Sequence, residues 1–390
     1  MAVLDPAIVI PCYNRPHSLK RLLHSLQNGV YSQRVPLVFS IDRSENDAIF
    51  KIASDFHWPF GEKEIIHHPS RLGLRDNIIF CGDLTDQYGS IIILEDDLFV
   101  SPAFYSYALK ALGFYKDQEE IAGISLYAYD CTETRRFRFF PVYDGYDNCF
   151  MQWPSSRGQA WTSEQWQGFK EWYKKYCSSD LSSFSIPESV KNWPQTSWKK
   201  YFIAYMVDCK SYFVYPRFSF STNFGDNGTH DKKGSSSLVQ VPLSIATNLE
   251  PKYSLISNSI SIYDSFFQLK PSCLKQLAPF LREYDFIVDM EGLKSSQKDE
   301  NTYTLSTRRC IKPMMSFDCT MKPYEMNVIN QIDGTIIHFG KTSDFDSDLK
   351  WFKDNEVLTR FDRVLPLMDY PLITFYKLFH KFKNMYHQNY

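Results

Sequence analysis

The sequence lacks the features of a disulfide-stabilised or exported protein. It has nine cysteines in 390 residues, an odd number, and no two of them form a CxxC pair. This spacing argues against a disulfide framework or a cysteine-rich zinc site, and it favours a reducing compartment. The opening residues, MAVLDPAIVIPCYNRP, have no basic region ahead of an apolar run, so we interpret them as a first strand and not as a signal peptide. A cytoplasmic protein is therefore predicted.

Long apolar runs and a strong charge of one sign are also missing. No window approaches the roughly 18 apolar residues that a membrane-spanning helix needs. The net charge is −2, and no basic region predicts a nucleic-acid partner. Hydrophobic residues make up 44% of the chain, with 31 Phe, 25 Tyr and 8 Trp, which is enough for a large core and for stacking on sugars or bases. We expect one large domain with an appendage.

Strands and helices alternate over the first hundred residues. Strands are predicted at residues 7–10, 35–42, 63–69 and 91–94, with helices at 18–27, 46–56 and 73–89 between them. This alternation predicts an α/β fold with a mainly parallel central sheet and right-handed crossovers. In such sheets ligands bind at the carboxyl ends of the strands.

The later part of the chain no longer shows the regular alternation of strands and helices. We assign residues 1–250 to the main domain and residues 255–345 to a small appended β-containing subdomain, because DFIVDMEGL, TYTLSTRR and GTIIHFG indicate short strands. Terminal helices are expected over 346–390. From Leu372 onward, apolar residues at 3–4 spacing alternate with Lys and His, as in a basic amphipathic helix. Such a helix can lie peripherally on an anionic membrane or pack on the catalytic domain, and both interpretations stay open.

Three acidic residues, Glu95, Asp96 and Asp97, directly follow the apolar run 91–94. Adjacent carboxylates at the end of a buried strand repel each other and lose solvation, so a positive partner is expected. Carboxylate oxygens are the ligands that Mg²⁺ and Mn²⁺ prefer, often with phosphate oxygens completing the shell. The alternatives are a solvated turn, a helix cap, or a pair with Lys or Arg.

Two segments carry a resemblance to a known group of enzymes. AIVIPCYNRPHSLKRLLHSL resembles the first strand and helix of GT-A glycosyltransferases, and ILEDDLFVSPAF resembles their DXD element in its EDD form. The similarity is greatest to the Golgi alpha-mannoside N-acetylglucosaminyltransferase and to bacterial family-2-like relatives. FMQWPSSRGQAWTSEQWQGF and residues 198–231 resemble later motifs of this group. The resemblance covers about residues 5–232 and implies the Rossmann-like fold of nucleotide-diphospho-sugar transferases.

The resemblance also implies roles for individual residues. Asp97 would bind Mn²⁺ or Mg²⁺, which bridges the two phosphates of a nucleotide-sugar and stabilises the departing diphosphate. His230 would be a second metal ligand or contact a phosphate. The remaining predicted nucleotide-sugar contacts are Pro11, Tyr13, Arg15, Asp42, Arg75, Glu95, Asp96 and Trp161. For Trp161 and its neighbour Trp153, core packing is an open alternative to stacking on a sugar.

The catalytic base is the point where the match fails. An inverting enzyme needs a carboxylate to accept the proton of the acceptor hydroxyl. The Golgi relative and typical family 2 enzymes carry it at the start of the helix that aligns with Ser197–Tyr201, where this sequence has no acid, as is often the case in the bacterial relatives. The candidates are Asp226, Glu164, Asp144 and Asp147, so the base and the stereochemistry stay open.

The sequence as a whole predicts a metal-dependent glycosyltransferase of the hexosyltransferase class. It would move a sugar, on family grounds from a UDP-sugar and with inversion, to a hydroxyl of a bacterial surface glycan. A capsule, a lipopolysaccharide or a lipid-linked glycan would serve as the acceptor. One alternative is a non-catalytic protein with a decayed nucleotide-sugar site. Another is a sugar-nucleotide nucleotidyltransferase, which would need a Gly-rich loop such as GxGxR that PCYNRP does not provide.

Overall fold

The computed structural model describes residues 4–226, 239–294 and 302–346. The chain divides into two compact units. The first unit consists of residues 1–134 and 141–277, and the second of residues 135–140 and those from 278 onward. In the described ranges, no helix has the length and apolar character needed to cross a membrane.

The first unit is built on a large mixed sheet. Within the described residues it has nine strands in the order β11-β7-β9-β6-β8-β4-β1-β2-β3. Strands β4, β1, β2 and β3 are parallel, whereas β8 is antiparallel to both of its neighbours. The strands are β1 (Ala7–Cys12), β2 (Leu37–Ile41), β3 (Lys63–His67), β4 (Ser90–Ile93), β6 (Ile121–Ser125), β7 (Asn148–Met151), β8 (Gln159–Thr162), β9 (Tyr212–Pro216) and β11 (Ile262–Tyr263). The predicted α/β class and the parallel order of the first four strands are confirmed.

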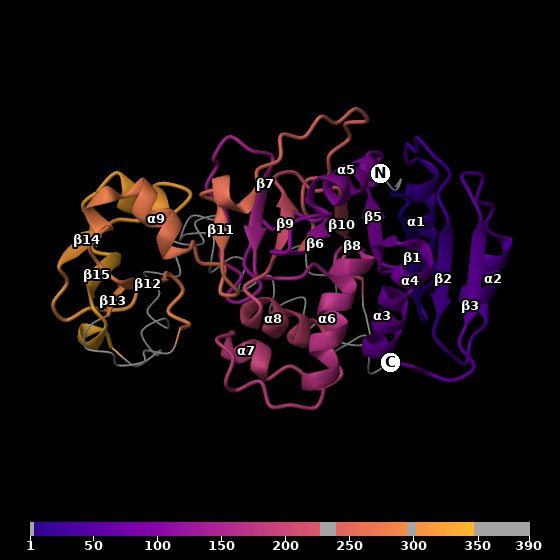
Figure 1. Ribbon diagram of the computed structural model, residues 1–390, viewed down its shortest axis with the longest axis horizontal. Helices are drawn as coiled ribbons and strands as arrows, with labels where there is room; N and C mark the ends of the chain where they lie inside the picture. The colour runs from indigo at the N-terminus through magenta and orange to yellow at the C-terminus, as the bar shows by residue number, and fades with distance from the viewer. Residues whose placement is uncertain (1–3, 227–238, 295–301, 347–390) are drawn as a thin grey trace, which may run out of the picture. The chain divides into compact units, whose positions relative to one another are not determined.

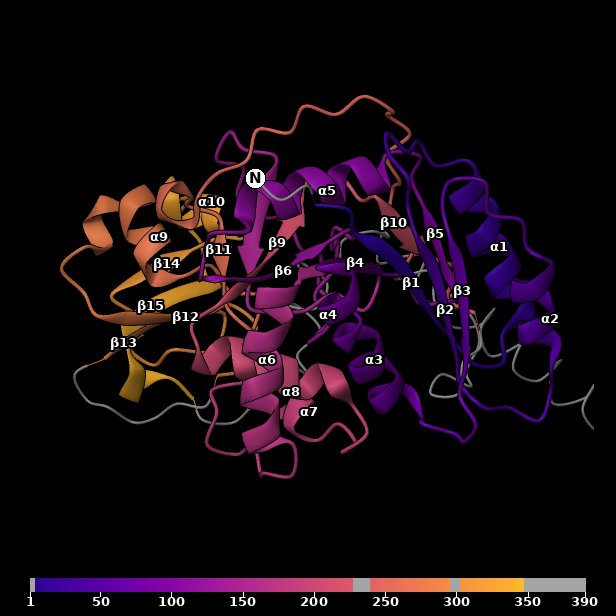
Figure 2. The same cartoon turned by 45° about the vertical axis from the view of Figure 1, so that its right-hand side comes forward.

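Helices cover both faces of this sheet (Figures 1 and 2). On one face lie α1 (Pro16–Gln27), α2 (Ala48–Asp55) and α5 (Phe104–Tyr115). On the other lie α3 (Leu74–Asp83), α4 (Thr85–Tyr88), α6 (Ser163–Tyr176) and α8 (Trp198–Asp208). The first unit also contains α7 (Glu188–Lys191), α9 (Pro271–Leu277) and the 3₁₀ turn η2 (Ile256–Asn258).

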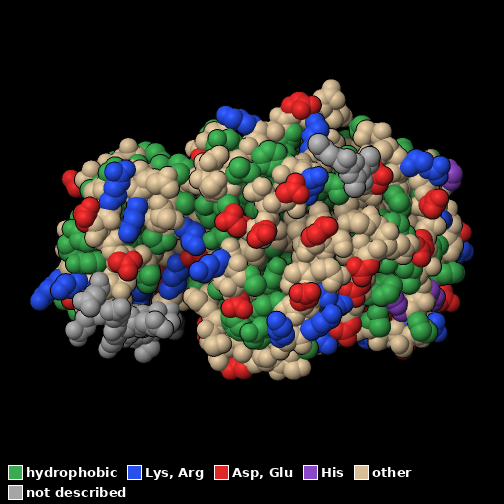
Figure 3. All heavy atoms as spheres, in the orientation of Figure 1, with side chains coloured by type: hydrophobic (Ala, Val, Ile, Leu, Met, Phe, Trp, Pro, Cys, Tyr) green, Lys and Arg blue, Asp and Glu red, His purple; other side chains and the backbone are tan. Residues whose placement is uncertain are grey.

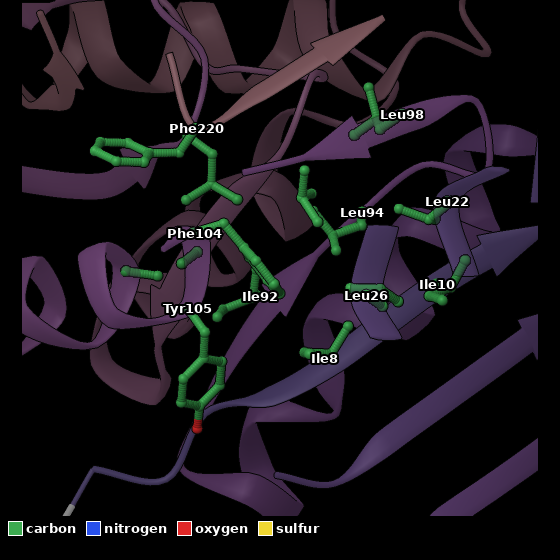
Figure 4. Packing of buried hydrophobic residues seen from close by; sticks show 14 of the residues in the cluster. Ile8, Ile10, Leu22, Leu26, Ile92, Leu94, Leu98, Phe104, Tyr105 and Phe220 are labelled. Atoms are coloured by element: carbon green, nitrogen blue, oxygen red, sulfur yellow. The ribbon is translucent and has the colours of Figure 1, made fainter. Parts of the chain in front are cut away.

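All six residues of β1 are buried, because successive side chains of the strand point to opposite faces of the sheet and helices cover both faces. In β1, Ile8 and Ile10 point toward α1, where Leu22 and Leu26 pack on them (Figure 4). The predicted helix at 18–27 begins two residues earlier, at Pro16, because proline is well tolerated in the first turn. Each fully buried leucine contributes roughly 2 kcal/mol through removal of apolar surface from water.

A short second ladder follows the acidic segment. Strand β5 (Leu98–Val100) pairs antiparallel with β10 (Ser221–Asn223), so that Val100 lies opposite Ser221. The backbone N–H of Leu94 donates to the carbonyl of Val9 at 3.0 Å, which extends the β1–β4 pairing up to the acids. These contacts bring residues 223–226 to the carboxyl end of β4.

The second unit contains a four-stranded sheet in the order β12-β13-β15-β14. Its elements are η3 (Pro279–Leu281), β12 (Phe286–Asp289), β13 (Tyr303–Ser306), β14 (Met315–Phe317), α10 (Glu325–Ile329), β15 (Ile337–Lys341) and η4 (Thr342–Asp344). The additional β-containing part that the sequence predicts is thus present. Residues 255–277 belong to the first unit, where β11 pairs with β7. The helices predicted for the chain end fall on residues 347–390, outside the described residues.

Charged side chains of both signs lie on the face of the first unit that Figure 3 shows. In the view of Figure 3, its acidic and basic side chains are interspersed, in keeping with the net charge of −2. This face therefore carries no large region of one charge sign, and the charges considered below are those inside the pocket.

Candidate active site

A pocket opens at the carboxyl ends of β1, β2 and β4, the position expected for a ligand in an α/β sheet. Its volume is about 450 Å³. It is lined by Pro11, Cys12, Tyr13, Asn14, Arg15, Asp42, Arg71, Gly73, Leu74, Asn77, Glu95, Asp96, Asp97, Ser156, Arg157, Thr196, Asn223, Gly225, Asp226 and Val239.

The acid triple, defined here as Glu95, Asp96 and Asp97, forms the floor of this pocket next to Arg15. One guanidinium nitrogen, Nη1, lies 2.5 Å from Asp97 Oδ2, and Nη2 pairs with Asp96. Burial raises the pKa of Asp96 to about 6 against the opposing charge of Arg15. Burial and the neighbouring Asp97 charge raise the pKa of Glu95 well above its usual value. The expected positive partner is thus supplied, within the described residues, by an arginine of the same chain.

Asp97 has the chemistry of a divalent-cation ligand. Its Oδ1 atom is buried and has no hydrogen-bond partner among the described residues. No group of three or more His, Cys, Asp or Glu side chains in the described ranges is arranged to hold a metal by itself. Mg²⁺ commonly takes only one or two protein carboxylates and fills its shell with phosphate oxygens and water. The residues therefore fit a cation that binds together with a diphosphate. His230 lies outside the described residues.

Asp42 organises the pocket wall through backbone contacts. Its Oδ1 accepts from the N–H of Leu72 at 2.7 Å, and its Oδ2 accepts from the N–H of Gly73 at 2.9 Å. Gly73 has φ of 80°, a left-handed conformation that favours glycine, and it immediately precedes α3. Asp42 thus fixes the loop that enters α3. Its contact with a base or ribose stays a prediction.

Aromatic and cationic side chains form the adjoining wall. The guanidinium of Arg71 lies 4.6 Å from the centre of the Tyr13 ring, and both residues line the pocket beside the buried Pro11. Arg75, predicted to contact the base or diphosphate, does not line it. Its Nε donates to Asp76 at 2.8 Å and its Nη1 to the carbonyl of Gln195 at 3.1 Å. Arg71, four residues earlier, is the arginine of this loop that reaches the pocket.

Two of the aromatic candidates are core residues. Trp161 is completely buried, with its ring 4.9 Å from Trp166 and 5.8 Å from Phe202, centre to centre. Trp153 is also buried and does not line the pocket. For Trp161 the structure favours core packing, because β8 lies in the middle of the sheet and both faces of the strand are covered.

Of the four base candidates, only Asp226 lines the pocket. It accepts from Ser18 Oγ at 2.6 Å and pairs with Arg21. Glu164 is exposed on the first turn of α6, away from the pocket. Asp144 accepts from Arg217 at 3.0 Å, and Asp147 accepts from the N–H of Lys252 at 2.7 Å. Those two carboxylates therefore stabilise local structure elsewhere in the first unit.

The structure also shows a charged cluster that sequence reasoning missed. Arg157 Nη1 donates to Glu133 at 2.7 Å, Lys199 Nζ donates to Glu133 at 2.8 Å, and the Tyr129 hydroxyl donates to it at 2.5 Å. Burial alone would raise the pKa of Glu133, but Lys199 and Arg157 together lower it to about 2. Lys199 lies in the first turn of α8. No local motif links these residues, since they come from three separate segments.

Comparison with known proteins bears directly on this site. Residues 7–163 match the family described as Glycosyl transferase family 2. The matched segment is less than half of the chain, and it includes β1 to β4, the acid triple and Arg157. With the fold described above, it supports a glycosyltransferase of the GT-A type, as the motifs predicted. No curated protein matches the chain at a significant level.

Two solved structures show distant similarity to this chain. S. aureus TarS residues 1–349, in complex with UDP-GlcNAc, shares 9% identity, with a TM-score of 0.37, over 59% of this chain and 61% of that one. GalNAc-T7 with UDP, GalNAc and Mn²⁺ shares 12% identity, with a TM-score of 0.36, over 55% of this chain and 43% of that one. The chain thus spans less than two thirds of either protein, and similarity at this level defines no activity.

Proposed function

We propose that this protein is a metal-dependent glycosyltransferase that uses a nucleoside diphosphate sugar as its donor. The observation that carries the proposal is the acid triple on the floor of a 450 Å³ pocket, at the carboxyl end of β4, within a segment that matches Glycosyl transferase family 2. The Oδ1 atom of Asp97, which has no hydrogen-bond partner among the described residues, is the proposed ligand of Mn²⁺ or Mg²⁺. Such an ion would neutralise negative charge on the departing diphosphate.

Different side chains of the pocket are proposed to bind different parts of the donor. Tyr13, stacked against Arg71, offers an aromatic wall for a nucleobase, and Asp42 holds the adjoining loop in place. The guanidinium of Arg15 can pass from the acid triple to phosphate oxygens, which suit its planar geometry. Glu95 and Asp96 are proposed to face the ribose or the transferred sugar.

Asp226 is the proposed general base, on the strength of its place in the pocket wall. Its carboxylate would have to give up its contacts with Ser18 and Arg21 to accept a proton. An inverting outcome depends on this residue and belongs to the same proposal. His230 remains a proposed second metal ligand or phosphate contact.

The identity of the substrates is proposed from the resemblance of the motifs. UDP is the proposed nucleotide, and a hydroxyl of a surface polysaccharide or lipid-linked glycan is the proposed acceptor. The resemblance of the motifs is also the ground for proposing a similarity to the Golgi enzyme and membership of the hexosyltransferase class. A cytoplasmic location is proposed with them, including peripheral contact with the inner face of a membrane through the segment after Leu372.

The deciding experiment is calorimetric titration with UDP, GDP and CMP, each with and without Mn²⁺. We expect one nucleotide to bind at least tenfold more tightly with the metal, and Asp97→Ala to remove that difference while the fold is retained. Asp76→Ala is the matched control, because Asp76 is exposed and does not line the pocket. Equal affinity with and without Mn²⁺ in the unmodified protein would refute metal-dependent binding.

A binding protein without catalytic activity is the second candidate. It is favoured by one observation, that the carboxylate of Asp226 is held by Arg21 and Ser18. Release of UDP from a bound UDP-sugar in the presence of Mn²⁺ would exclude this candidate. Nucleotide binding without any release of UDP, with water or a glycan as acceptor, would support it.

A further inference from the structure

Two arginines flank the acid triple on neighbouring strands. Strand β4 lies between β1 and β8 in the sheet, and Arg15 follows β1 whereas Arg157 precedes β8. The β4–β8 ladder ends with Ile93 opposite Gln159, two residues before Glu95 and two residues after Arg157. Both arginines line the pocket, one on each side of the three carboxylates.

The two arginines are engaged in different ways. Arg15 gives both terminal nitrogens to Asp96 and Asp97. Arg157 pairs instead with Glu133, and within the described residues it makes no ion pair with the acid triple. Glu133, which follows β6, thus holds the Arg157 guanidinium away from the nearest acids of the pocket.

Charge and rigidity distinguish this cluster from an ordinary ion pair. Glu133 is shared between Arg157 and Lys199, so one carboxylate faces two cations and a net positive charge remains. Lys199 is only 7% exposed. The Arg157 guanidinium also lies 5.0 Å from the Tyr127 ring centre and 5.6 Å from that of Tyr129, which restricts its orientation.

The guanidinium retains donors for a ligand. In the described part of the chain, only Nη1 of Arg157 donates to another side chain, and no nitrogen of Arg157 is both buried and without a partner. Its remaining N–H groups are therefore not fully buried, and the residue itself lines the pocket. An oriented guanidinium with free N–H groups is well suited to binding a phosphate or carboxylate with two parallel hydrogen bonds.

We propose that Arg157 forms an anion-binding subsite on the β8 side of the acid triple, with Glu133 and Lys199 as its positioning residues. The ligand is a phosphate or carboxylate group of a substrate, carried by the donor or by the acceptor. Tyr13 and Asp42 lie on the opposite side of the acid triple, toward β1 and β2, where the nucleoside is proposed to bind. The subsite therefore belongs to the end of the pocket that receives the sugar and the acceptor. This inference rests on the proposed function.

The test compares the full-length protein with Arg157→Gln by calorimetry in the presence of Mn²⁺. The probes are UMP, UDP, UDP-glucose and UDP-glucuronate, followed by free glucuronate and inorganic phosphate added to UDP-saturated protein. We expect at least a tenfold loss of affinity for one class of anion. A loss for UDP but not for UMP identifies the distal phosphate as the ligand. A loss for UDP-glucuronate but not for UDP-glucose identifies a sugar carboxylate, and a loss for the free anions identifies an acceptor group.

Unchanged affinity of folded Arg157→Gln for every probe would overturn the proposal. The variant is expected to fold, because Glu133 keeps its bonds to Lys199 and Tyr129. Arg157→Lys is the second variant. It keeps the charge but loses the planar geometry, so it should recover only part of the lost affinity. Arg75→Gln is the matched control, because Arg75 does not line the pocket. This variant should bind all probes with the affinity of the unmodified protein.

Failure of the proposed function can be distinguished from failure of the subsite. If the unmodified protein binds no nucleotide, the glycosyltransferase proposal fails, and inorganic phosphate alone becomes the probe. Phosphate binding that is lost in Arg157→Gln would then still support the subsite. A protein that binds neither nucleotides nor simple anions would overturn both proposals.

Discussion

Arg15 and Asp97, 82 residues apart in the sequence, form an ion pair of 2.5 Å at the carboxyl ends of the adjacent strands β1 and β4. Because Asp96 binds the same guanidinium, one arginine neutralises much of the acid triple. The site thus carries its own counter-ion, which occupies the carboxylates that a divalent cation would need. Binding of the cation and movement of Arg15 are expected to be linked.

Arg15→Ala should therefore raise the affinity for Mn²⁺ in the absence of nucleotide, by several-fold or more. Without a divalent cation the same variant should be less stable than the unmodified protein. Removing one partner of a fully buried ion pair commonly costs about 3–5 kcal/mol, and the loss should be smaller here because the Arg15 side chain is partly exposed. Mn²⁺ titration followed by electron paramagnetic resonance, together with thermal unfolding, measures both effects. Arg21→Ala is the control, because Arg21 pairs with Asp226 and not with the acid triple. Weaker Mn²⁺ binding in Arg15→Ala would contradict the linkage.

Asp42→Ala should disturb the pocket through its loop. The N–H groups of Leu72 and Gly73 would lose their carboxylate acceptor, and each such charge-assisted bond contributes roughly 1.5–3 kcal/mol. We expect hydrogen exchange to speed up at residues 72 and 73, with at least tenfold weaker nucleotide binding. Asp47→Ala, at an exposed position before α2, should change neither property. Full protection of both amides in Asp42→Ala would show that the loop does not depend on this carboxylate.

The second unit should be less stable at neutral pH than at acidic pH because of Glu325. Burial raises the pKa of this carboxyl from 4.5 to about 7. A raised pKa in the folded state means that the folded protein binds the proton more tightly. The contribution to stability is therefore complete below pH 4.5 and is lost as the pH rises through 7. It amounts to about 3 kcal/mol at most.

Glu325→Gln should remove this pH dependence. The free energy of unfolding of the second unit is measured by denaturant titration between pH 4.5 and 8 for Glu325→Gln and for the unmodified protein. Glu283→Gln is the control, because Glu283 is exposed. A stability profile that is the same for Glu325→Gln and the unmodified protein would rule out Glu325 as the titrating group.

Gly82→Ala tests the packing of α3 against α6 beneath the pocket. A Cβ atom at residue 82 would lie 2.1 Å from the Trp166 ring, so the ring or the helix would have to move. Overpacking of this kind typically costs about 1–3 kcal/mol, and nucleotide affinity should fall with it, since α3 carries pocket residues.

Gly113→Ala provides the matched control within α5. The nearest atom to its added Cβ, on Leu4, is 3.9 Å away. Alanine is favoured over glycine in a helix by up to about 1 kcal/mol, so this variant should be neutral or stabilised. Equal thermal stability of the two variants would show that Trp166 can move without cost.

The features that the sequence predicted correctly are those with a local signal. The parallel strands follow from apolar runs separated by helical periodicity, and the acid triple stands directly after one of these runs. The carboxyl ends of parallel strands meet at one edge, so Asp42, Arg15 and Asp97 were expected to gather around a ligand. All three line the same pocket.

The features that the sequence missed depend on long-range geometry. Trp161 is buried because β8 inserts between β4 and β6, which no spacing along the chain indicates. Arg75 does not line the pocket but bonds to Asp76 and to the carbonyl of Gln195, which is 120 residues away in the sequence. Glu133 lies 24 residues from Arg157 and 66 residues from Lys199 in sequence, so their cluster has no motif.

The ladder between β5 and β10 can form only late in the synthesis of the chain. The strand that precedes the acids, β4, and the strands β1, β2 and β3 all belong to the first hundred residues, whereas β10 begins at Ser221. A growing chain folds from its N-terminal side as it leaves the ribosome. The three carboxylates are therefore synthesised more than a hundred residues before the segment that encloses them. Until Asn223 has emerged, the nascent chain has the three acids but not the pocket residues Asn223, Gly225 and Asp226. We therefore expect the proposed binding of a nucleotide-sugar to begin only after that point.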